Sequence, residues 1–197
     1  MAELSAFVLA GGKSSRTGSD KATMLLGGVP LLEIATRKAL ALTESVFVVG
    51  PRSRFGAHAI EDVFPERGPL GGIHAALSQS STELNLMLAV DLPFVPVPFL
   101  QLLQRQAVSS PALVVVPRLP SGWQPLCALY KKGFCASAEQ ALNAGRNKID
   151  ALFAFLPIRV IDQAEIEAAG FTPAIFDNLN TPEDFERARL SFGRVPG

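Results

Sequence analysis

One run of residues, Leu84–Val90 (LNLMLAV), is too apolar to be exposed on either face of a sheet. A strand that is buried on both faces is typical of a parallel sheet covered by helices. Other apolar runs of strand length alternate along the chain with segments whose apolar residues have helical spacing. This alternation predicts an α/β fold with a largely parallel sheet.

The pattern places each element approximately. Strands are expected at Ala6–Ala10, Ser45–Val49, Leu84–Val90, Ala112–Val116, Leu126–Tyr130 and Ile158–Ile161, of which Ser45–Val49 (SVFVV) is expected to be buried. Helices are expected to begin at Pro30, to cover Leu70–Leu77, Pro98–Ala107 and Phe134–Leu142, and to begin again at Thr181–Pro182. Because no internal repeat or long linker interrupts this order, residues 1–197 are expected to form one domain.

The charge balance excludes several classes of partner. Eighteen lysines and arginines balance 18 acidic residues, so the chain lacks the basic excess expected for binding nucleic acid or an anionic membrane. Two cysteines and two histidines, at unsuitable spacing, predict neither a disulfide framework nor a structural zinc site. The sequence shows no secretory signal and no uninterrupted apolar span, so the cytoplasm is the expected location.

A glycine-rich loop, Leu9–Lys21 (LAGGKSSRTGSDK), follows the first expected strand directly. Glycines let backbone N–H groups approach a ligand closely, and such groups together form an anion-binding concavity. Lys13, Arg16 and Lys21 add positive charge, and the arginine fork suits phosphate oxygens. The loop therefore predicts a phosphate-binding site.

Two better-known phosphate loops do not match this segment. A P-loop ending at Gly12-Lys13-Ser14 requires an earlier glycine where Phe7 stands. The dinucleotide fingerprint is also missing, because its three glycines have a different spacing. A solvated surface turn is the remaining alternative, but it does not explain three cations in one glycine loop.

A lone acid, Asp91, follows the most apolar strand in the segment Leu88–Phe94. Ligands of open α/β sheets bind outside the carboxyl ends of the strands, so Asp91 could hold Mg²⁺ carried by a nucleotide. Asp91 could equally turn the chain before Pro93, as aspartate often does. The residues alone favour neither interpretation.

The loop L-A-G-G-x-S-x-R-x-G-x-x-K resembles the signature of nucleotidyltransferases with the sugar-nucleotide transferase fold. Its double-glycine form most resembles the molybdenum cofactor guanylyltransferases, although Thr17 replaces the usual methionine. The segments Asp91–Phe94 (DLPF) and Asn178–Asp184 (NLNTPED) support the same branch, and the resemblance runs from Phe7 to about Phe185. It implies a three-layer α/β/α, Rossmann-like fold with a mixed, mostly parallel sheet.

The resemblance also implies roles for individual residues. Nucleotide binding is implied for Leu9, Ala10, Gly11, Gly12, Ser14, Gly18, Lys21, Asp62 and Asp91; catalysis for Arg16, Lys21 and Asp91; and Mg²⁺ binding for Asp91. Acceptor binding is implied for Gly68, Gly72, Asn178 and Asn180, with Arg146 and Lys148 near the acceptor phosphate. Structural alternatives remain for Gly68-Pro69 as a tight connection and for Asn178 as a partner of backbone groups.

The activity implied by the resemblance is transfer of GMP from GTP to molybdopterin with release of pyrophosphate. Its substrates are GTP and molybdopterin, its cofactor is Mg²⁺, and its expected transient partners are molybdenum insertion proteins and apo-molybdoenzymes, with no nucleic acid and no membrane. Three alternatives stay open: a nucleotidyltransferase that uses CTP or a sugar phosphate, a non-catalytic nucleotide-binding carrier, and a dinucleotide-binding oxidoreductase. The missing fingerprint disfavours the last.

Overall fold

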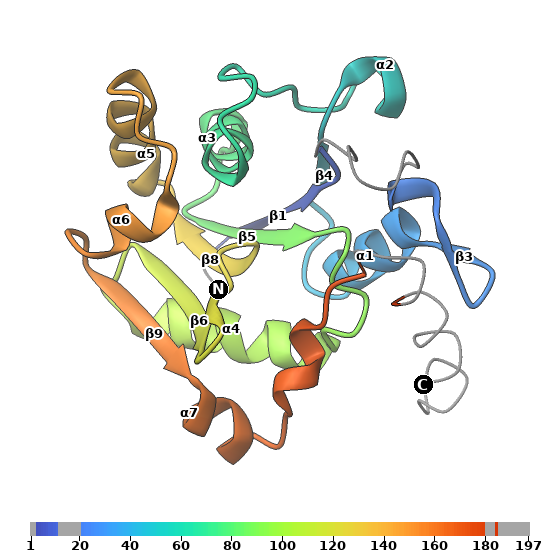
Figure 1. The fold of residues 1–197 in the computed structure, drawn as a ribbon, viewed down its shortest axis with the longest axis vertical. Helices are drawn as coiled ribbons and strands as arrows, with labels where there is room; N and C mark the ends of the chain where they lie inside the picture. The colour runs from blue at the N-terminus through green and yellow to red at the C-terminus, as the bar shows by residue number, and fades with distance from the viewer. Residues whose placement is uncertain (1–2, 12–20, 180–183, 185–197) are drawn as a thin grey trace.

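The structure, a computed structural model, describes residues 3–11, 21–179 and 184 (Figure 1). Its central sheet has seven strands in the order β4-β1-β5-β8-β6-β7, and β9 pairs with β6. The strands of this sheet are β1 (Leu4–Leu9), β4 (Val46–Val49), β5 (Leu84–Ala89), β6 (Val114–Leu119), β7 (Gly122–Trp123), β8 (Cys127–Lys131) and β9 (Ile158–Asp162). A separate two-stranded sheet consists of β2 (Leu25–Leu26) and β3 (Val29–Pro30).

The helices lie on both faces of the central sheet. They are α1 (Leu31–Leu40), α2 (Arg52–Phe55), α3 (Pro69–Gln79), α4 (Val97–Ser109), α5 (Phe134–Asn143), α6 (Ile149–Phe153) and α7 (Gln163–Ala168), with the 3₁₀ turns η1 (Lys21–Thr23) and η2 (Pro173–Phe176). Figure 1 shows α3 and α5 on one side of the sheet and α4 on the other. No helix within the described residues combines the length and apolar character needed to cross a bilayer.

The sheet is mixed and mostly parallel, as expected. β4, β1 and β5 pair in parallel, and so do β6 and β9. β8 lies antiparallel between β5 and β6, so β6 again points the same way as β5. The carboxyl ends of β1, β4 and β5 therefore meet at one edge of the sheet.

The alternation of side chains along β1 explains the three layers. Leu4, Ala6 and Val8 belong to the core beneath α1 and α4, whereas Phe7 and Leu9 belong to the core beneath α3 and α5. All six residues of β1 are buried, and so are all six residues of β5. A strand in this position is predominantly apolar on both faces, and the buried polar residues Ser5 and Asn85 are hydrogen-bonded to Thr82 and to the Tyr130 carbonyl.

The expectation of a buried strand at Ser45–Val49 is wrong in one respect. β4 lies at the edge of the sheet, with β1 as its strand partner, and Phe47 is 41% exposed. The ring of Phe47 nevertheless stacks on that of Phe7, with centroids 5.4 Å apart. A continuous apolar run therefore does not distinguish an edge strand from a central one, because only the pairing of strands decides exposure.

Candidate functional site

The loop after β1 and the turn after β5 begin at the same edge of the sheet. β1 and β5 are neighbours, with Leu9 in register with Ala89. The Val90 N–H donates to the Leu9 carbonyl over 3.2 Å, which holds the carboxyl ends of the two strands together. Residues 10 and 91 therefore leave the sheet side by side, at the edge where ligands of such sheets bind.

Lys21 and Asp91 meet at this edge. Lys21 Nζ lies 2.9 Å from Asp91 Oδ2, although the two residues are 70 positions apart in the sequence. Their side chains are 23% and 24% exposed, so the pair is accessible from solvent. An ammonium and a carboxylate in one accessible place can bind the negative and positive parts of a metal-nucleotide complex.

The chain passes very close to itself where β1 and β4 end. The Gly11 N–H donates to the Val49 carbonyl over 3.1 Å. A Cβ on Gly11 would lie 3.4 Å from the Cα of Gly50, so the two glycine backbones are almost in contact. Ala10 is buried beside them. The other predicted residues of this loop, Gly12, Ser14, Arg16 and Gly18, lie outside the described residues, and their roles stay predictions.

Asp62 is held over the beginning of α3. Its Oδ1 accepts a 2.8 Å hydrogen bond from the Phe64 N–H. A Cβ on Gly71 would lie only 2.4 Å from its Oδ2, so glycine at position 71 makes room for the carboxylate. Burial raises the pKa of Asp62, while the Phe64 N–H and the nearby His74 oppose that rise. Gly71 is not among the site residues predicted from the sequence, although the glycine pair Gly71-Gly72 was a signal for it.

The beginning of α3 lies against the end of β1. Gly68 precedes this helix with φ 66° and ψ −155°, a conformation that side chains other than glycine rarely adopt. A Cβ on Gly72 would lie 3.1 Å from Leu9 Cδ2. Gly72, which is predicted to bind the acceptor, thus contacts a residue predicted to bind the nucleotide. Both assignments stay predictions, and the structure places the two residues in one neighbourhood.

The carboxyl-terminal segment also reaches the site. The Leu179 N–H donates to the Asp91 carbonyl over 3.2 Å, and Leu179 is buried. Its neighbour Asn178 is exposed, as an amide that binds a substrate must be. Asn180 lies outside the described residues, as does the predicted helix start at Thr181–Pro182.

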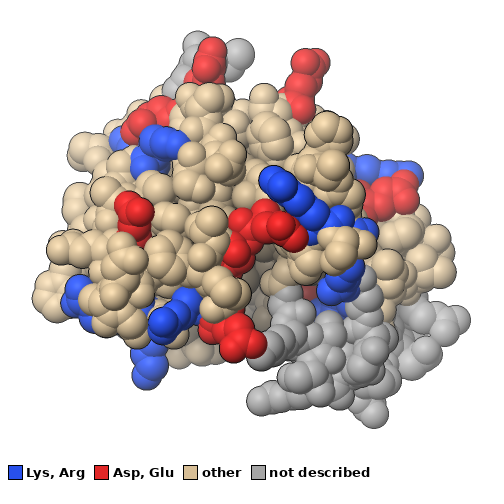
Figure 2. Space-filling model, turned by 90° about the horizontal axis from the view of Figure 1, so that it is seen from above, with Lys and Arg blue, Asp and Glu red and all other residues tan. Residues whose placement is uncertain are grey.

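The loops before α3 and after α5 lie next to one another. Arg67 Nη1 is 3.4 Å from Asn147 Oδ1, which brings the loop with Arg146 and Lys148 beside the segment that leads to Gly68. Arg146 and Lys148 are exposed. Figure 2 shows basic and acidic side chains interspersed on the face seen from above rather than gathered by sign. Neither sign of charge dominates on that face, which agrees with the balanced composition.

The donor groups fit a metal that arrives with a nucleotide. Among the described residues, no group of three or more histidine, cysteine, aspartate or glutamate side chains could hold a metal ion. Asp91 supplies one accessible carboxylate at the edge of the sheet. Mg²⁺ is commonly bound by one or two carboxylates together with substrate phosphates, and one carboxylate is sufficient for that arrangement.

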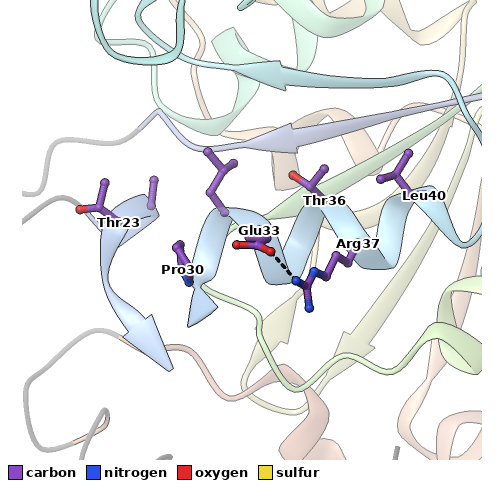
Figure 3. A pocket seen from close by; sticks show the side chains of 8 residues that line it. Thr23, Pro30, Glu33, Thr36, Arg37 and Leu40 are labelled. Carbon is purple, nitrogen blue, oxygen red and sulfur yellow. Dashed lines mark hydrogen bonds and ion pairs between the residues drawn. The ribbon is translucent and has the colours of Figure 1, made fainter. Parts of the chain in front are cut away.

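A shallow hollow of about 480 Å³ lies on the outer side of α1 (Figure 3). The ion pair between Glu33 and Arg37 crosses it, and its lining includes neither Lys21 nor Asp91. The lining residues are Ala22, Thr23, Pro30, Leu32, Glu33, Thr36, Arg37 and Leu40. Because it lacks the convergent polar groups found at the edge of the sheet, we do not identify it as the functional site.

Comparison with known protein families and curated sequences gives consistent matches. A family model described as "MobA-like NTP transferase domain" matches residues 6–160. A protein of Trichormus variabilis named "Probable molybdenum cofactor guanylyltransferase" is 34% identical over 192 residues, which cover 93% of this chain and 89% of that protein.

Solved structures agree with these matches. Molybdopterin-guanine dinucleotide biosynthesis protein A from Archaeoglobus fulgidus superposes with a TM-score of 0.83 at 26% identity, over 97% of this chain and all of that chain (100%). The 2-C-methyl-D-erythritol 4-phosphate cytidylyltransferase from Thermus thermophilus has a TM-score of 0.69 at 16% identity, over 96% of this chain and 98% of that chain. The second match shows the fold alone.

Proposed function

This chain belongs to the MobA-like NTP transferase family, among relatives named molybdenum cofactor guanylyltransferases, and from that premise we propose that it transfers GMP from GTP to molybdopterin. The products are molybdopterin guanine dinucleotide and pyrophosphate. The single observation that carries the proposal is the 2.9 Å contact between Lys21 and Asp91. Residues from two distant motifs thereby form one accessible site at the edge where nucleotides bind in such sheets.

The reaction is a displacement at the α-phosphorus of GTP. A phosphate oxygen of molybdopterin forms the new P–O bond, and the bond from the α-phosphorus to the bridging oxygen of pyrophosphate breaks. The attacking phosphate is already an anion, so no side chain has to remove a proton from it. Catalysis then depends on positioning the phosphates and on stabilising the negative charge of the leaving group.

Lys21 and the loop after β1 supply that stabilisation in this proposal. The ammonium of Lys21 binds the polyphosphate, together with the backbone N–H groups of the loop and the guanidinium of Arg16. Lys21 is paired with Asp91 in the structure. Asp91 would hold Mg²⁺, which when bound neutralises phosphate charge.

The acceptor would approach from the side of the carboxyl-terminal segment. Asn178 and Asn180 offer amides to molybdopterin, and Gly68 and Gly72 let it approach the backbone of α3. Arg146 and Lys148 are exposed beside Arg67, where they would attract the acceptor phosphate. Molybdenum insertion proteins and apo-molybdoenzymes are the proposed transient partners, because they would supply the acceptor and take the product.

Incubation of the protein with Mg²⁺, molybdopterin and each nucleoside triphosphate in turn tests the proposal directly. We expect pyrophosphate release and a dinucleotide product with GTP. Product from CTP alone would identify a cytidylyltransferase instead, and nucleotide binding without any product would identify a carrier. Either result would overturn the proposed activity.

Lys21→Ala tests the role of the loop by calorimetry. We expect the affinity for GTP to fall about tenfold or more, because a charged hydrogen bond to phosphate contributes about 1.5–3 kcal/mol. Lys131→Ala is a suitable control, because the Nζ of Lys131 donates to the Ser110 carbonyl, away from the edge of the sheet. Unchanged GTP affinity in Lys21→Ala would show that the loop does not contact the nucleotide.

A further inference from the structure

Lys38 occupies a position of α1 that the helical spacing assigns to the core. Leu31, Ile34, Ala35 and Ala39 form the buried face of this helix. Position 38 follows Leu31 by seven residues and Ile34 by four, so it lies on the same face. An apolar residue is expected there, and the lysine therefore requires an explanation.

The side chain of Lys38 extends from α1 to the turn that carries Asp91. Its Nζ donates a hydrogen bond to the Pro93 carbonyl, 55 residues along the chain. Burial lowers the pKa of Lys38 to about 8. The titratable group identified near its ammonium is the thiol of Cys127 on β8, whose pKa burial raises to about 12, so that thiol is neutral.

The Pro93 carbonyl belongs to a turn whose backbone is hydrogen-bonded on both sides of Asp91. Before it, the Val90 N–H donates to the Leu9 carbonyl. After it, the Leu92 N–H bonds the Ala89 carbonyl over 3.3 Å. Pro93 has no N–H, so its carbonyl is the backbone group through which the turn can be held at that residue. Lys38 makes that contact from the helix layer below.

We propose that Lys38 is a positioning residue for the transfer reaction, which holds the turn from Asp91 to Pro93 so that the Asp91 carboxylate faces Lys21 and the nucleotide. This inference rests on the proposed function, since it names a further residue for the same site. Lys38 itself does not touch the substrate. It acts through the Pro93 carbonyl and the two peptide bonds between Pro93 and Asp91.

Fold stability alone does not explain a lysine at this position. Removing an ammonium from water has a free-energy cost that an apolar side chain of similar length avoids. Methionine at position 38 would fill the same space and keep the stripe apolar. A lysine is useful there if the turn needs a hydrogen-bond donor that α1 cannot otherwise provide.

Lys38→Met is the variant that distinguishes a positioning role in the reaction from a role in fold stability. We expect kcat to fall about tenfold to a hundredfold, because a shift of about 1 Å in a reacting group has an effect of that size. The KM for GTP is expected to change less than about threefold, and the melting temperature to stay the same or rise. Lys38→Arg retains a donor and is expected to recover part of kcat.

Lys132→Met is a matched control. The Nζ of Lys132 donates to the Leu77 and Ser80 carbonyls at the end of α3, so it is another part-buried lysine that binds backbone oxygens. Loss of that contact is expected to lower the melting temperature and leave kcat unchanged. A merely structural role for Lys38 would give the same result in Lys38→Met, and the proposal would then be wrong.

Hydrogen exchange of the Leu92 and Val95 amides provides a readout that does not depend on activity. Their N–H groups donate to the Ala89 and Leu92 carbonyls within the turn. We expect both amides to exchange faster in Lys38→Met than in the wild type, and those of β5 to be unchanged. Unaltered exchange would overturn the positioning role even if the wild type forms the dinucleotide. Absence of dinucleotide in the wild type would overturn the proposed function, whatever the exchange shows.

Discussion

Asp91 and Asp62 are the two carboxylates of the candidate site, and their surroundings differ. Asp91 is 2.9 Å from the ammonium of Lys21, at the end of a central strand. Asp62 accepts a hydrogen bond from the neutral Phe64 N–H and lies over the backbone of Gly71. One carboxylate is in direct contact with a cation, whereas the other accepts from a backbone N–H and has the nearby His74 as an electrostatic partner.

These surroundings indicate what each carboxylate can bind. A carboxylate beside a cation at the edge where phosphates are expected would suit Mg²⁺, which is commonly held by one or two carboxylates together with substrate phosphates. Burial disfavours the charged form of Asp62 and thereby raises its pKa. Hydrogen-bond donors of a neutral ligand would favour that charged form again. We therefore propose that Asp91 serves the phosphates and their metal, and that Asp62 binds the N–H groups of the guanine edge.

His74 completes the surroundings of Asp62. It is buried, its ring meets the ring of Phe64 edge-on at 5.0 Å, and its Nδ1 has no hydrogen-bond partner within the described part of the chain. The imidazole therefore supports Asp62 through Phe64, whose N–H binds the carboxylate. Asp62 is thus supported by a backbone hydrogen bond, by packing and by the nearby His74, whereas Asp91 is in direct contact with an ammonium.

Asp91→Asn removes the carboxylate that is paired with Lys21 and is expected to have the largest effect. Turnover should fall about a hundredfold to a thousandfold, the usual range for loss of one electrostatic group at a reacting centre. Stability should change by less than about 1 kcal/mol, because the pair with Lys21 is partly exposed. Steady-state rates and urea unfolding measure both.

Asp162→Asn is the matched control for that variant. Asp162 caps α7 by accepting from the Glu165 N–H, and asparagine caps helices equally well. Normal turnover in Asp162→Asn and near-normal turnover in Asp91→Asn together would remove Asp91 from the mechanism.

Gly71→Ala disturbs the surroundings of the second carboxylate, Asp62. The new Cβ would lie 2.4 Å from Asp62 Oδ2, so the carboxylate must rotate away. GTP affinity should fall on the order of a hundredfold, equivalent to loss of hydrogen bonds to a charged group. Stability should change little, because alanine favours a helix and the displaced atom ends a flexible side chain.

Gly133→Ala controls for the substitution itself. Gly133 has φ −59°, and a Cβ there would lie 3.2 Å from Leu113 Cδ2 on another part of the surface. Calorimetry with GTP should give the wild-type affinity for this variant. Equal affinities for Gly71→Ala and Gly133→Ala would show that Asp62 does not contact GTP.

Asp62→Asn keeps the shape of the side chain and removes its charge, so its effect should be smaller. We expect GTP to bind about tenfold more weakly, with kcat nearly unchanged. Inosine triphosphate lacks the 2-amino group of guanine and makes the test specific. The wild type should prefer GTP to inosine triphosphate, and Asp62→Asn should lose most of that preference; a preference that persists would assign base recognition elsewhere.

The smallest expected effect is on the pH dependence of stability and concerns Lys38, which contacts the turn that carries Asp91. Lys38 has a pKa of about 8 in the folded chain and an ordinary value of 10.5. Between these pH values the unfolded chain binds this proton and the folded chain does not, so the contribution of Lys38 to stability rises with pH. The stability difference between wild type and Lys38→Met should therefore shift in favour of the wild type from pH 8 to 10. A constant difference would contradict the burial of that ammonium.

Sequence patterns predicted most of the layers but not the edges of the sheet. The helices α1, α3, α4 and α5 occur where periodicity and turn residues placed them, and Gly145, at φ 71°, follows the end of α5. Strand order was not predictable in the same way. β4 is an edge strand, and β8 runs against its neighbours, because these properties depend on pairings between distant segments.

The site shows the same division. The glycine loop and the DLPF turn were recognisable as motifs, and the structure brings Lys21 to Asp91. Gly71 and Lys38 were not selected, because neither belongs to a pattern that indicates chemistry by itself. Their significance arises only from the atoms beside them, Asp62 Oδ2 and the Pro93 carbonyl.

The sequence by itself indicated the principal strands and helices and the loop that is predicted to bind phosphate, because local periodicity and backbone freedom are properties of neighbouring residues. Tertiary structure alone decided that the Lys21 ammonium contacts the Asp91 carboxylate, 70 residues away in the sequence. It also decided that Lys38, on the apolar face of α1, contacts the Pro93 carbonyl. Those contacts follow from the parallel register of β1 with β5 and from the packing of α1 beneath them, and no local pattern encodes either distance.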